Sequence, residues 1–334
     1  MHPPRLPDRI TRRLRLPLVA APMFSVSGVD LVVAACRNGV VGAFPTVNAR
    51  STAVLDQWLS EIAARLFAAP EEAAPVCPNL IMRSPRMAAD LACLVKHRVE
   101  LVITSVGSPS PAVAALHDIG CLVLADVATL GHARKAIAAG ADGLVLLTAG
   151  AGGQTGWLNP LAFVRALRAE YDGPLVLAGG ISDGVALRAA QVLGCDLAYM
   201  GTRFIATRES LADPAYRDLL VQASLDDVLL TQAFTGLPTN MLVASIRRAG
   251  LDPARLDEQV SPASAAHLFG GGTHRDQAEA DAANTADPTH GPTHGPKRWR
   301  DIWSAGHSVS GVAAVQSVDA LVAQVEQEFH RAGG

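Results

Sequence analysis

Eight short runs of Val, Leu, Ile and Ala recur between residues 17 and 202, and they constrain the fold more than any other feature of this chain. They begin roughly 20 to 30 residues apart, and helical stretches such as 51–67 and 129–139 separate them, as in repeated strand and helix units. Strands that are apolar throughout are typical of a parallel sheet buried on both faces. The runs are 17–21, 40–44, 76–81, 101–105, 122–126, 143–148, 175–179 and 197–202.

Eight such units, complete by about residue 222, favour a closed TIM (β/α)8 barrel over an open, doubly wound sheet. In these barrels the chemistry lies at the C-terminal ends of the strands. Glycines and several polar residues gather at those ends in this sequence. They are Met23, Asn79, Asp126, 150–156, 179–180 and 201–202. We therefore expect the functional site at this end of the barrel.

The remainder of the chain divides into three further parts. Residues 223–272 contain SLDDVLLTQAF, NMLVASIRRAG and PARLDEQ, which predict a small helical domain appended to the barrel at 1–222. Residues 273–298 lack apolar periodicity and predict a mobile loop. Residues 299–334 end in a helix near 317–330 that returns to the barrel. Its apolar face would comprise Val318, Leu321, Val322, Val325 and Phe329.

Composition points to small-molecule partners and a cytoplasmic protein. Hydrophobic residues make up 49% of the chain, charged residues 18%, and the formal net charge is -3, so no general field for nucleic acid or an anionic membrane is expected. There is no apolar run of about 18 residues that would span a membrane. The basic N-terminus lacks the cleavage site of a secretory signal. A homo-oligomer is compatible with these features.

Neither the cysteines nor the histidines predict a metal site. The five cysteines are far apart, without a C-x-x-C pair, and we expect them to be reduced and mostly buried. The tetrapeptide PTHG occurs twice in tandem within 273–298. Two histidines four residues apart could bind a metal on a helix, but the Gly and Pro between them prevent a helix.

Three glycine-rich strand ends predict a phosphate-binding site. LTAGAGGQTGWLNP (147–160) follows the sixth strand, and glycine content alone would equally fit a flexible surface loop. LVLAGGISDG then ends the seventh strand with a glycine pair and the N-cap candidates Ser182 and Asp183, and YMGTRF ends the eighth. Glycines after strands seven and eight form the phosphate site of many barrels. We expect a phosphorylated cofactor or substrate.

Several of these segments, in this order, resemble the nitronate monooxygenases, also called 2-nitropropane dioxygenases. They are APMFSVSGVDLVVAACRNGVVGAFP, AGAGGQTG, AGGISDG, MGTRF and WSAGHSVSG. The resemblance spans nearly the whole chain. It implies a TIM barrel that binds FMN non-covalently and oxidises an alkyl nitronate with dioxygen. Related flavin enoyl-acyl-carrier-protein reductases and quinone reductases share the scaffold.

The resemblance also implies roles for individual residues. The backbone of Ala21, Pro22 and Met23 would lie beside the flavin ring, and Asn79 would bond the flavin or its ribityl chain. Lys135 would stabilise the reduced flavin near N1 and O2, unless it is a solvated helix lysine. Asp126 and Asp142 would contact the cofactor or only cap neighbouring turns. The phosphate would be held by Gly152, Gly153, Gly179, Gly180, Gly201 and Thr202.

Two positions depart from the family pattern. Gln154 stands where many members have a histidine that is the proposed base for neutral nitroalkanes, and an amide cannot accept a proton near neutral pH. His307, in SAGHSVSG, replaces a common glutamine. It is a candidate catalytic residue near the flavin, although a lone histidine is more often structural or exposed.

Three functions are compatible with this sequence. The first is flavin-dependent oxidation of a small anion such as an alkyl nitronate, with Gln154 and loop amides bonding the nitro oxygens. The second is an NAD(P)H-dependent reductase of enones or quinones, which rapid anaerobic bleaching by NADH would indicate. The third is a flavin-binding protein without turnover, which would bind FMN tightly but fail to re-oxidise after chemical reduction.

Overall fold

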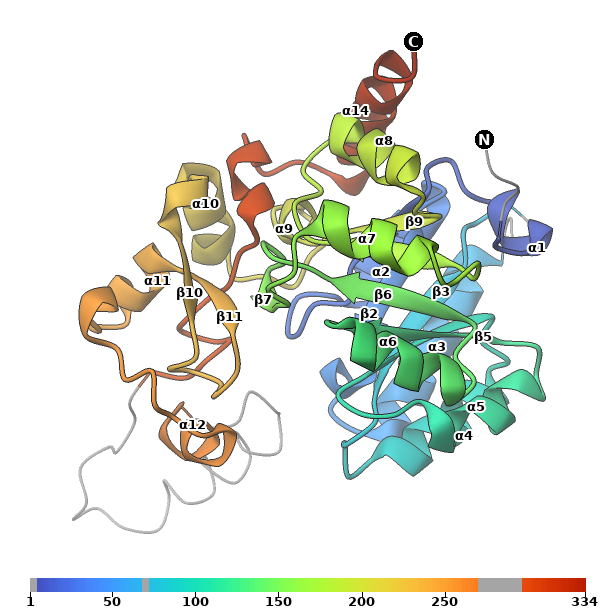
Figure 1. Ribbon diagram of the computed structural model, residues 1–334, viewed down its shortest axis with the longest axis horizontal. Helices are drawn as coiled ribbons and strands as arrows, with labels where there is room; N and C mark the ends of the chain where they lie inside the picture. Colours follow the sequence, from blue (N-terminus) through green and yellow to red (C-terminus); the bar gives the residue numbers. More distant parts are fainter. Residues whose placement is uncertain (1–4, 68–71, 270–295) are drawn as a thin grey trace.

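The computed structural model describes residues 5–67, 72–269 and 296–334, and its centre is a closed barrel of eight parallel strands (Figure 1). Each predicted apolar run forms one strand, with ends that agree to within two residues. The predicted TIM barrel is therefore confirmed. In barrel order the strands are β1 (Leu18–Ala20), β2 (Val41–Pro45), β3 (Val76–Ile81), β4 (Leu101–Ser105), β5 (Leu122–Val127), β6 (Gly143–Leu147), β8 (Leu175–Ala178) and β9 (Leu197–Met200).

Helices follow the strands on the outside of the barrel. Several begin at a side chain that satisfies a free backbone N–H: Thr129 accepts from His132 at the start of α6, and Asp183 from Ala186 at the start of α8, as its sequence predicts. The helices are α2 (Val29–Arg37), α3 (Thr52–Leu66), α4 (Met87–Lys96), α5 (Ser110–His117), α6 (Leu130–Ala138), α7 (Pro160–Arg168) and α8 (Gly184–Leu193). The short helices α1 (Asp8–Thr11), η1 (Thr46–Asn48) and α9 (Thr202–Ile205) lie in connections, and α10 (Pro214–Gln222) follows α9.

Apolar side chains pack the inside of the barrel. Each strand contributes residues to this interior cluster, which is almost entirely buried; it includes Val19, Val41, Cys77, Ile103, Leu124, Val145, Val176 and Tyr199. A filled interior is typical of eight-stranded barrels. Space for a ligand is therefore left at the strand ends rather than along the barrel axis.

The C-terminal helix α14 (Val318–Arg331) packs against α8 and α2 on the outside of the barrel (Figure 1). Its buried residues are the five that the sequence predicts for its apolar face: Val318, Leu321, Val322, Val325 and Phe329. A Cβ atom at Gly184 would lie 2.2 Å from the backbone nitrogen of Phe329. The first residue of α8 must therefore be glycine for the two helices to approach this closely.

The appended segment beside the barrel is not purely helical, and this part of the prediction is wrong. SLDDVLLTQAF and the start of NMLVASIRRAG form β10 (Val228–Thr231) and β11 (Thr239–Leu242), which pair in an antiparallel manner. A four-residue apolar run fits a strand as well as a helix, and here β11 also pairs with β7 (Gly153–Gln154) in the loop after β6. The remaining elements are η2 (Leu225–Asp227), α11 (Val243–Arg248), η3 (Pro253–Arg255), α12 (Pro262–Phe269) and η4 (His307–Gly311).

Most of 273–298, including both PTHG repeats, lies outside the described residues. The mobile loop and the expected lack of a metal site there stay predictions. All five cysteines lie in the described part and are buried, as predicted. No helix in the described ranges is both long and apolar enough to cross a membrane.

Candidate active site

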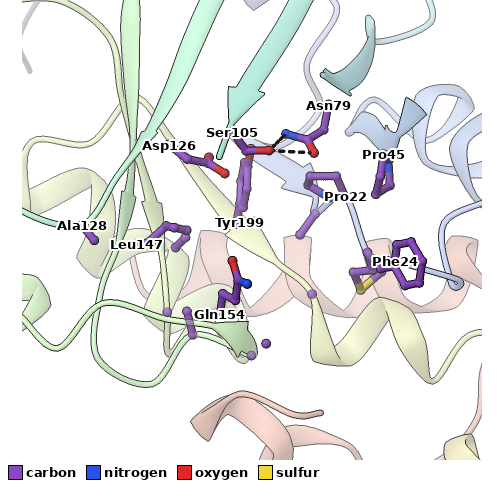
Figure 2. Close-up of a pocket in the computed structure, with 18 of the residues that line it drawn as sticks. Pro22, Phe24, Pro45, Asn79, Ser105, Asp126, Ala128, Leu147, Gln154 and Tyr199 are labelled. Atoms are coloured by element: carbon purple, nitrogen blue, oxygen red, sulfur yellow. Dashed lines mark hydrogen bonds between the residues drawn. The ribbon is translucent and has the colours of Figure 1, made fainter. Parts of the chain in front are cut away.

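A cavity of about 770 Å³ opens at the C-terminal ends of the barrel strands, where the sequence predicts the site (Figure 2). This volume is within the range of roughly 300 to 1,000 Å³ found for small-molecule sites. All eight barrel strands or the residues that follow them reach its wall, and Leu237, Trp299 and Trp303 close it from the appended segment and the C-terminal region. The fold therefore offers one large site shared by the barrel and its appendage.

All of the predicted site residues except His307 and the alternative contact Asp142 line this cavity. They are Ala21, Pro22, Met23, Asn79, Asp126, Lys135, Gly152, Gly153, Gln154, Gly179, Gly180, Gly201 and Thr202. His307 begins η4 with an exposed side chain and donates its backbone N–H to the Gly150 carbonyl at 2.9 Å. The structure thus does not bring the His307 imidazole to the cavity.

The loop after β1 is held in place by two buried polar side chains. The Asn48 amide accepts from the Ser25 N–H at 3.0 Å and donates to the carbonyls of Met23 and Ser27, each at 2.9 Å. The Ser27 hydroxyl accepts from the Met23 N–H and donates to the Ala21 carbonyl. These bonds fix the backbone of 21–23 at the cavity wall, where the family resemblance places it beside a flavin.

The glycine-rich loop after β6 is anchored on both sides rather than free. On the barrel side, the Thr155 hydroxyl donates to the Thr148 carbonyl at 2.8 Å. From the appended segment, the Asn240 amide donates to the Ala151 carbonyl at 2.7 Å, and β11 pairs with β7. Figure 2 shows the Gln154 side chain directed from this loop into the cavity, toward Tyr199. Its amide makes no hydrogen bond with any described residue.

The end of β8 offers backbone donors to a ligand. Gly179 and Gly180 have φ angles of 128° and 77°, which favour glycine, and a Cβ atom at Gly180 would meet nothing within 4 Å. Within the described residues, the N–H groups of Gly180 and Ile181 donate to no acceptor. Adjacent free N–H groups are suited to an anion, and the open space where a Gly180 Cβ would stand could admit one. Thr202, on the neighbouring strand end, accepts from the Gly306 N–H at 3.0 Å.

Four polar side chains from β3, β4, β5 and β9 form what we call the polar floor: Asn79, Ser105, Asp126 and Tyr199 (Figure 2). Asn79 and Ser105 satisfy one another, since the amide donates to the hydroxyl at 3.1 Å and accepts from it at 3.2 Å. Asp126 Oδ1 and the Tyr199 hydroxyl are buried and have no hydrogen-bond partner in the described residues. Each such group costs about 1–3 kcal/mol unless a ligand or water satisfies it.

Burial also changes the protonation of the polar floor. Desolvation raises the pKa of Asp126 from 3.8 to about 7, because no cation or donor offsets the loss of water around its carboxylate. Desolvation, followed by the nearby Asp126 charge, raises the pKa of Tyr199 well above 10. Near neutral pH the floor therefore holds a neutral phenol and a carboxyl poised between its acid and its carboxylate.

Lys135 and Asp142, which the sequence also singled out as possible cofactor contacts, have different surroundings. Lys135 is exposed on α6, and it is also among the residues that line the cavity. Asp142 is not among the lining residues. Its carboxylate accepts from the Val123 N–H at 2.8 Å and contacts His117 at 2.9 Å, so it fixes a turn.

Sequence reasoning missed Tyr199, Ser105, Asn48 and Asn240. Tyr199 and Ser105 interrupt otherwise apolar runs near strand ends, and this was the available signal. The roles of Asn48 and Asn240 had no local signal, because their partners lie 21 to 25 residues and 89 residues away along the chain.

Comparison with known proteins agrees with this geometry. The sequence profile of the family described as nitronate monooxygenase matches residues 10–327. A nitronate monooxygenase from Paraburkholderia phytofirmans is 28% identical over 357 residues, covering 94% of this chain and 92% of the relative. One from Pseudomonas aeruginosa is 30% identical over 286 residues, covering 70% of this chain and 80% of the relative.

Among solved structures, nitroalkane oxidase from Streptomyces ansochromogenes matches with a TM-score of 0.76 and 25% identity, covering 98% of this chain and 99% of that one. The family profile covers the barrel, the appended segment and most of α14, so the match is not confined to a common barrel motif. The chain is an oxidoreductase that belongs to the nitronate monooxygenase family.

Proposed function

We propose that this protein binds FMN without a covalent bond in the cavity at the barrel mouth and uses dioxygen to oxidise alkyl nitronates. The nitronate monooxygenases that it resembles act, by their name, on nitronates, and the nitroalkane oxidase acts, by its name, on nitroalkanes. The observation that carries the substrate assignment is the amide of Gln154, directed into the cavity from an anchored loop.

The cavity fits FMN at both ends of the cofactor. The free N–H groups of Gly180 and Ile181 would bond the phosphate, and the open space at Gly180 would admit it. The polar floor would bond the ring, because flavin carries carbonyl oxygens and ring nitrogens that suit Asn79, Asp126 and Tyr199. When bound, the flavin supplies the electron transfer between substrate and dioxygen. Nothing among the lining residues suggests an adenine pocket, so we expect FMN rather than FAD.

Gln154 suits a substrate that arrives already deprotonated. Its N–H₂ group can donate to the oxygens of a nitronate, and no described residue competes for it. It cannot remove a carbon-bound proton from a neutral nitroalkane, and a positioned base usually contributes about 10² to 10⁴ to such a step. A nitronate has already lost that proton. The loop therefore favours binding and orientation of an anion over base catalysis.

Apolar side chains would exclude water from the bound nitronate. Phe24 contributes from the loop after β1, and Leu237, Trp299 and Trp303 contribute from the opposite wall. A water-poor site strengthens the hydrogen bonds between the loop and the nitro oxygens. The anchors at Asn240 and Thr155 hold those donors in position before the substrate arrives.

An anaerobic titration tests this proposal directly. Purified protein reconstituted with FMN is titrated first with a preformed alkyl nitronate and then, in a separate sample, with NADH, while the flavin absorbance is followed. We expect bleaching by the nitronate, return of the colour on admission of dioxygen, and little reaction with NADH. Rapid bleaching by NADH alone would replace the proposal with a pyridine nucleotide-dependent reductase. Failure to bind FMN would refute the cofactor assignment.

A further inference from the structure

A second group of functional side chains lies between α3 and α4, outside the residues that line the cavity. Asp56 belongs to α3, whereas Cys93 lies on α4 and His97 directly follows it. Asp56 Oδ1 is 2.6 Å from His97 Nε2 and 4.0 Å from Cys93 Sγ, and the three potential ligand atoms all lie within 4.8 Å of one another. We propose that Asp56, Cys93 and His97 form a binding site for a zinc-like divalent transition metal.

The three ligand types favour zinc over calcium or magnesium. Zn²⁺ takes thiolate, imidazole and carboxylate ligands at about 2.0 to 2.3 Å, usually in tetrahedral geometry, whereas calcium and magnesium prefer oxygen ligands alone. Cys93 and His97 are four residues apart at the end of one helix, so their side chains lie on the same face. The carboxylate of Asp56 comes from the facing helix. One position would remain for water.

The distances require only side-chain movements. Tetrahedral bonds of these lengths place ligand atoms about 3.2 to 3.6 Å apart. The Asp56 to His97 contact would open by roughly 0.7 Å as the metal replaces the shared proton, and the contacts of the Cys93 sulfur would shorten by roughly 0.5 to 1.3 Å. Rotation of the Asp56 and His97 side chains is enough for such changes. The backbone of the two helices need not move.

The surroundings expose the site but also provide a competitor. The Asp56 and His97 side chains are 37% and 16% exposed, so a cation and its water can enter, while Cys93 is 7% exposed. Lys96 Nζ lies 2.7 Å from the same Asp56 oxygen, and its side chain is 66% exposed. This ammonium must turn away into solvent when the metal binds. Removing the Lys96 charge should therefore tighten metal binding, whereas removing a ligand should weaken it.

Cobalt(II) provides the probe, because a tetrahedral Co²⁺ bound by thiolate absorbs at longer wavelengths than flavin does. The flavin-loaded protein, purified without a histidine tag, is titrated with Co²⁺ and then with Zn²⁺. His290 and His294 of the PTHG repeats are both replaced by Ala in the reference protein, so that they contribute no signal. We expect one equivalent of Co²⁺ with the spectrum of thiolate ligation, followed by its displacement by Zn²⁺.

Three variants decide the assignment. Cys93→Ser should remove the thiolate spectrum and weaken binding by more than about tenfold, the loss typical of even an outer-shell partner. Lys96→Gln should tighten binding severalfold. His117→Ala is the matched control, because His117 and Asp142 form the same imidazole and carboxylate pair at 2.9 Å, and it should change nothing.

Two results would overturn the proposal. The first is a Co²⁺ spectrum without thiolate character in the reference protein. The second is retention of the full spectrum in Cys93→Ser, whose native flavin absorbance and melting temperature would show that it has folded. Because these residues do not line the cavity, either outcome leaves the proposed nitronate oxidation untouched.

Discussion

Replacing Asp126 with Asn tests the physical character of the polar floor. A rise in pKa from 3.8 to about 7 corresponds to about 4 kcal/mol between the two protonation states. The folded protein holds this proton more tightly than the unfolded chain. Its stability should therefore fall as pH rises from about 4 to about 7, and remain low above that range.

The Asn variant keeps the shape of the neutral acid but cannot ionise. At pH 4 its free energy of unfolding should be close to that of the unmodified protein, and at pH 8 it should be higher by up to about 4 kcal/mol. Urea unfolding of the flavin-free protein at a series of pH values measures this difference. The infrared band of a protonated carboxylic acid, present near pH 5 and absent from the variant, measures the pKa itself.

Tyr199→Phe provides the control for that measurement. It removes the other unpartnered buried polar atom of the polar floor, but the phenol does not titrate between pH 4 and 8, since its pKa lies well above 10. Its stability should therefore keep the pH dependence of the unmodified protein. Parallel stability profiles for the Asn variant and the unmodified protein would refute the argument, because Asp126 would then be an ordinary, solvated carboxylate.

Three further predictions concern the cofactor, the substrate and the loop after β1. Gly180→Val should abolish FMN retention, measured by flavin release on gel filtration, whereas Gly120→Val, with a similar φ of 75° and equally open space, should retain it; equal retention would place the phosphate elsewhere. Gln154→Ala should raise the activation free energy of nitronate turnover by about 1–3 kcal/mol, and Gln154→His should raise activity on neutral nitroalkanes selectively. Oxygen consumption measures both activities. Asn48→Ala should lower the free energy of unfolding by about 2–4 kcal/mol in urea, because three backbone groups lose their partner; Asn38→Ala, which loses one such bond, should cost less, and similar losses would contradict this account.

The barrel could be predicted because its signal is local. Each strand is a nearly continuous apolar run, and turn or cap residues such as Asp183 separate the runs. The strands β10 and β11 could not, because the third strand of their sheet, β7, lies about 85 residues before β11 in the chain and has only two residues. No property of VLLT by itself distinguishes a strand in this sheet from a turn of helix.

The glycines of the candidate site could be predicted from the sequence, whereas several of its polar side chains could not. In the late motif SAGHSVSG, the sequence points to the histidine as a catalytic candidate. In the structure, the neighbouring Gly306 is the residue of this motif that packs closely against the loop after β6. A Cβ atom there would lie 2.8 Å from the Gly150 carbonyl and 2.9 Å from the Gly152 nitrogen. The burial of Asp126 likewise depends on which way its strand faces after the barrel closes. A sequence pattern alone does not supply that information.

A histidine at position 154 could both bind the substrate and accept its proton, whereas in this protein the amide of Gln154 can only bind, and the titratable group is Asp126. The Gln154 amide can bind the oxygens of a nitro group but cannot take the proton from the neighbouring carbon. Asp126, the one acidic residue among the described residues that line the cavity, has a pKa of about 7 and lies in the polar floor. As a neutral acid Asp126 can donate a hydrogen bond to a bound ring, which its carboxylate form cannot do. Ionisation would also place a negative charge beside a substrate that is itself an anion. Both effects favour a protonated Asp126 that would bond the proposed cofactor, and under the proposed function the nitronate would form in solution before it enters the site.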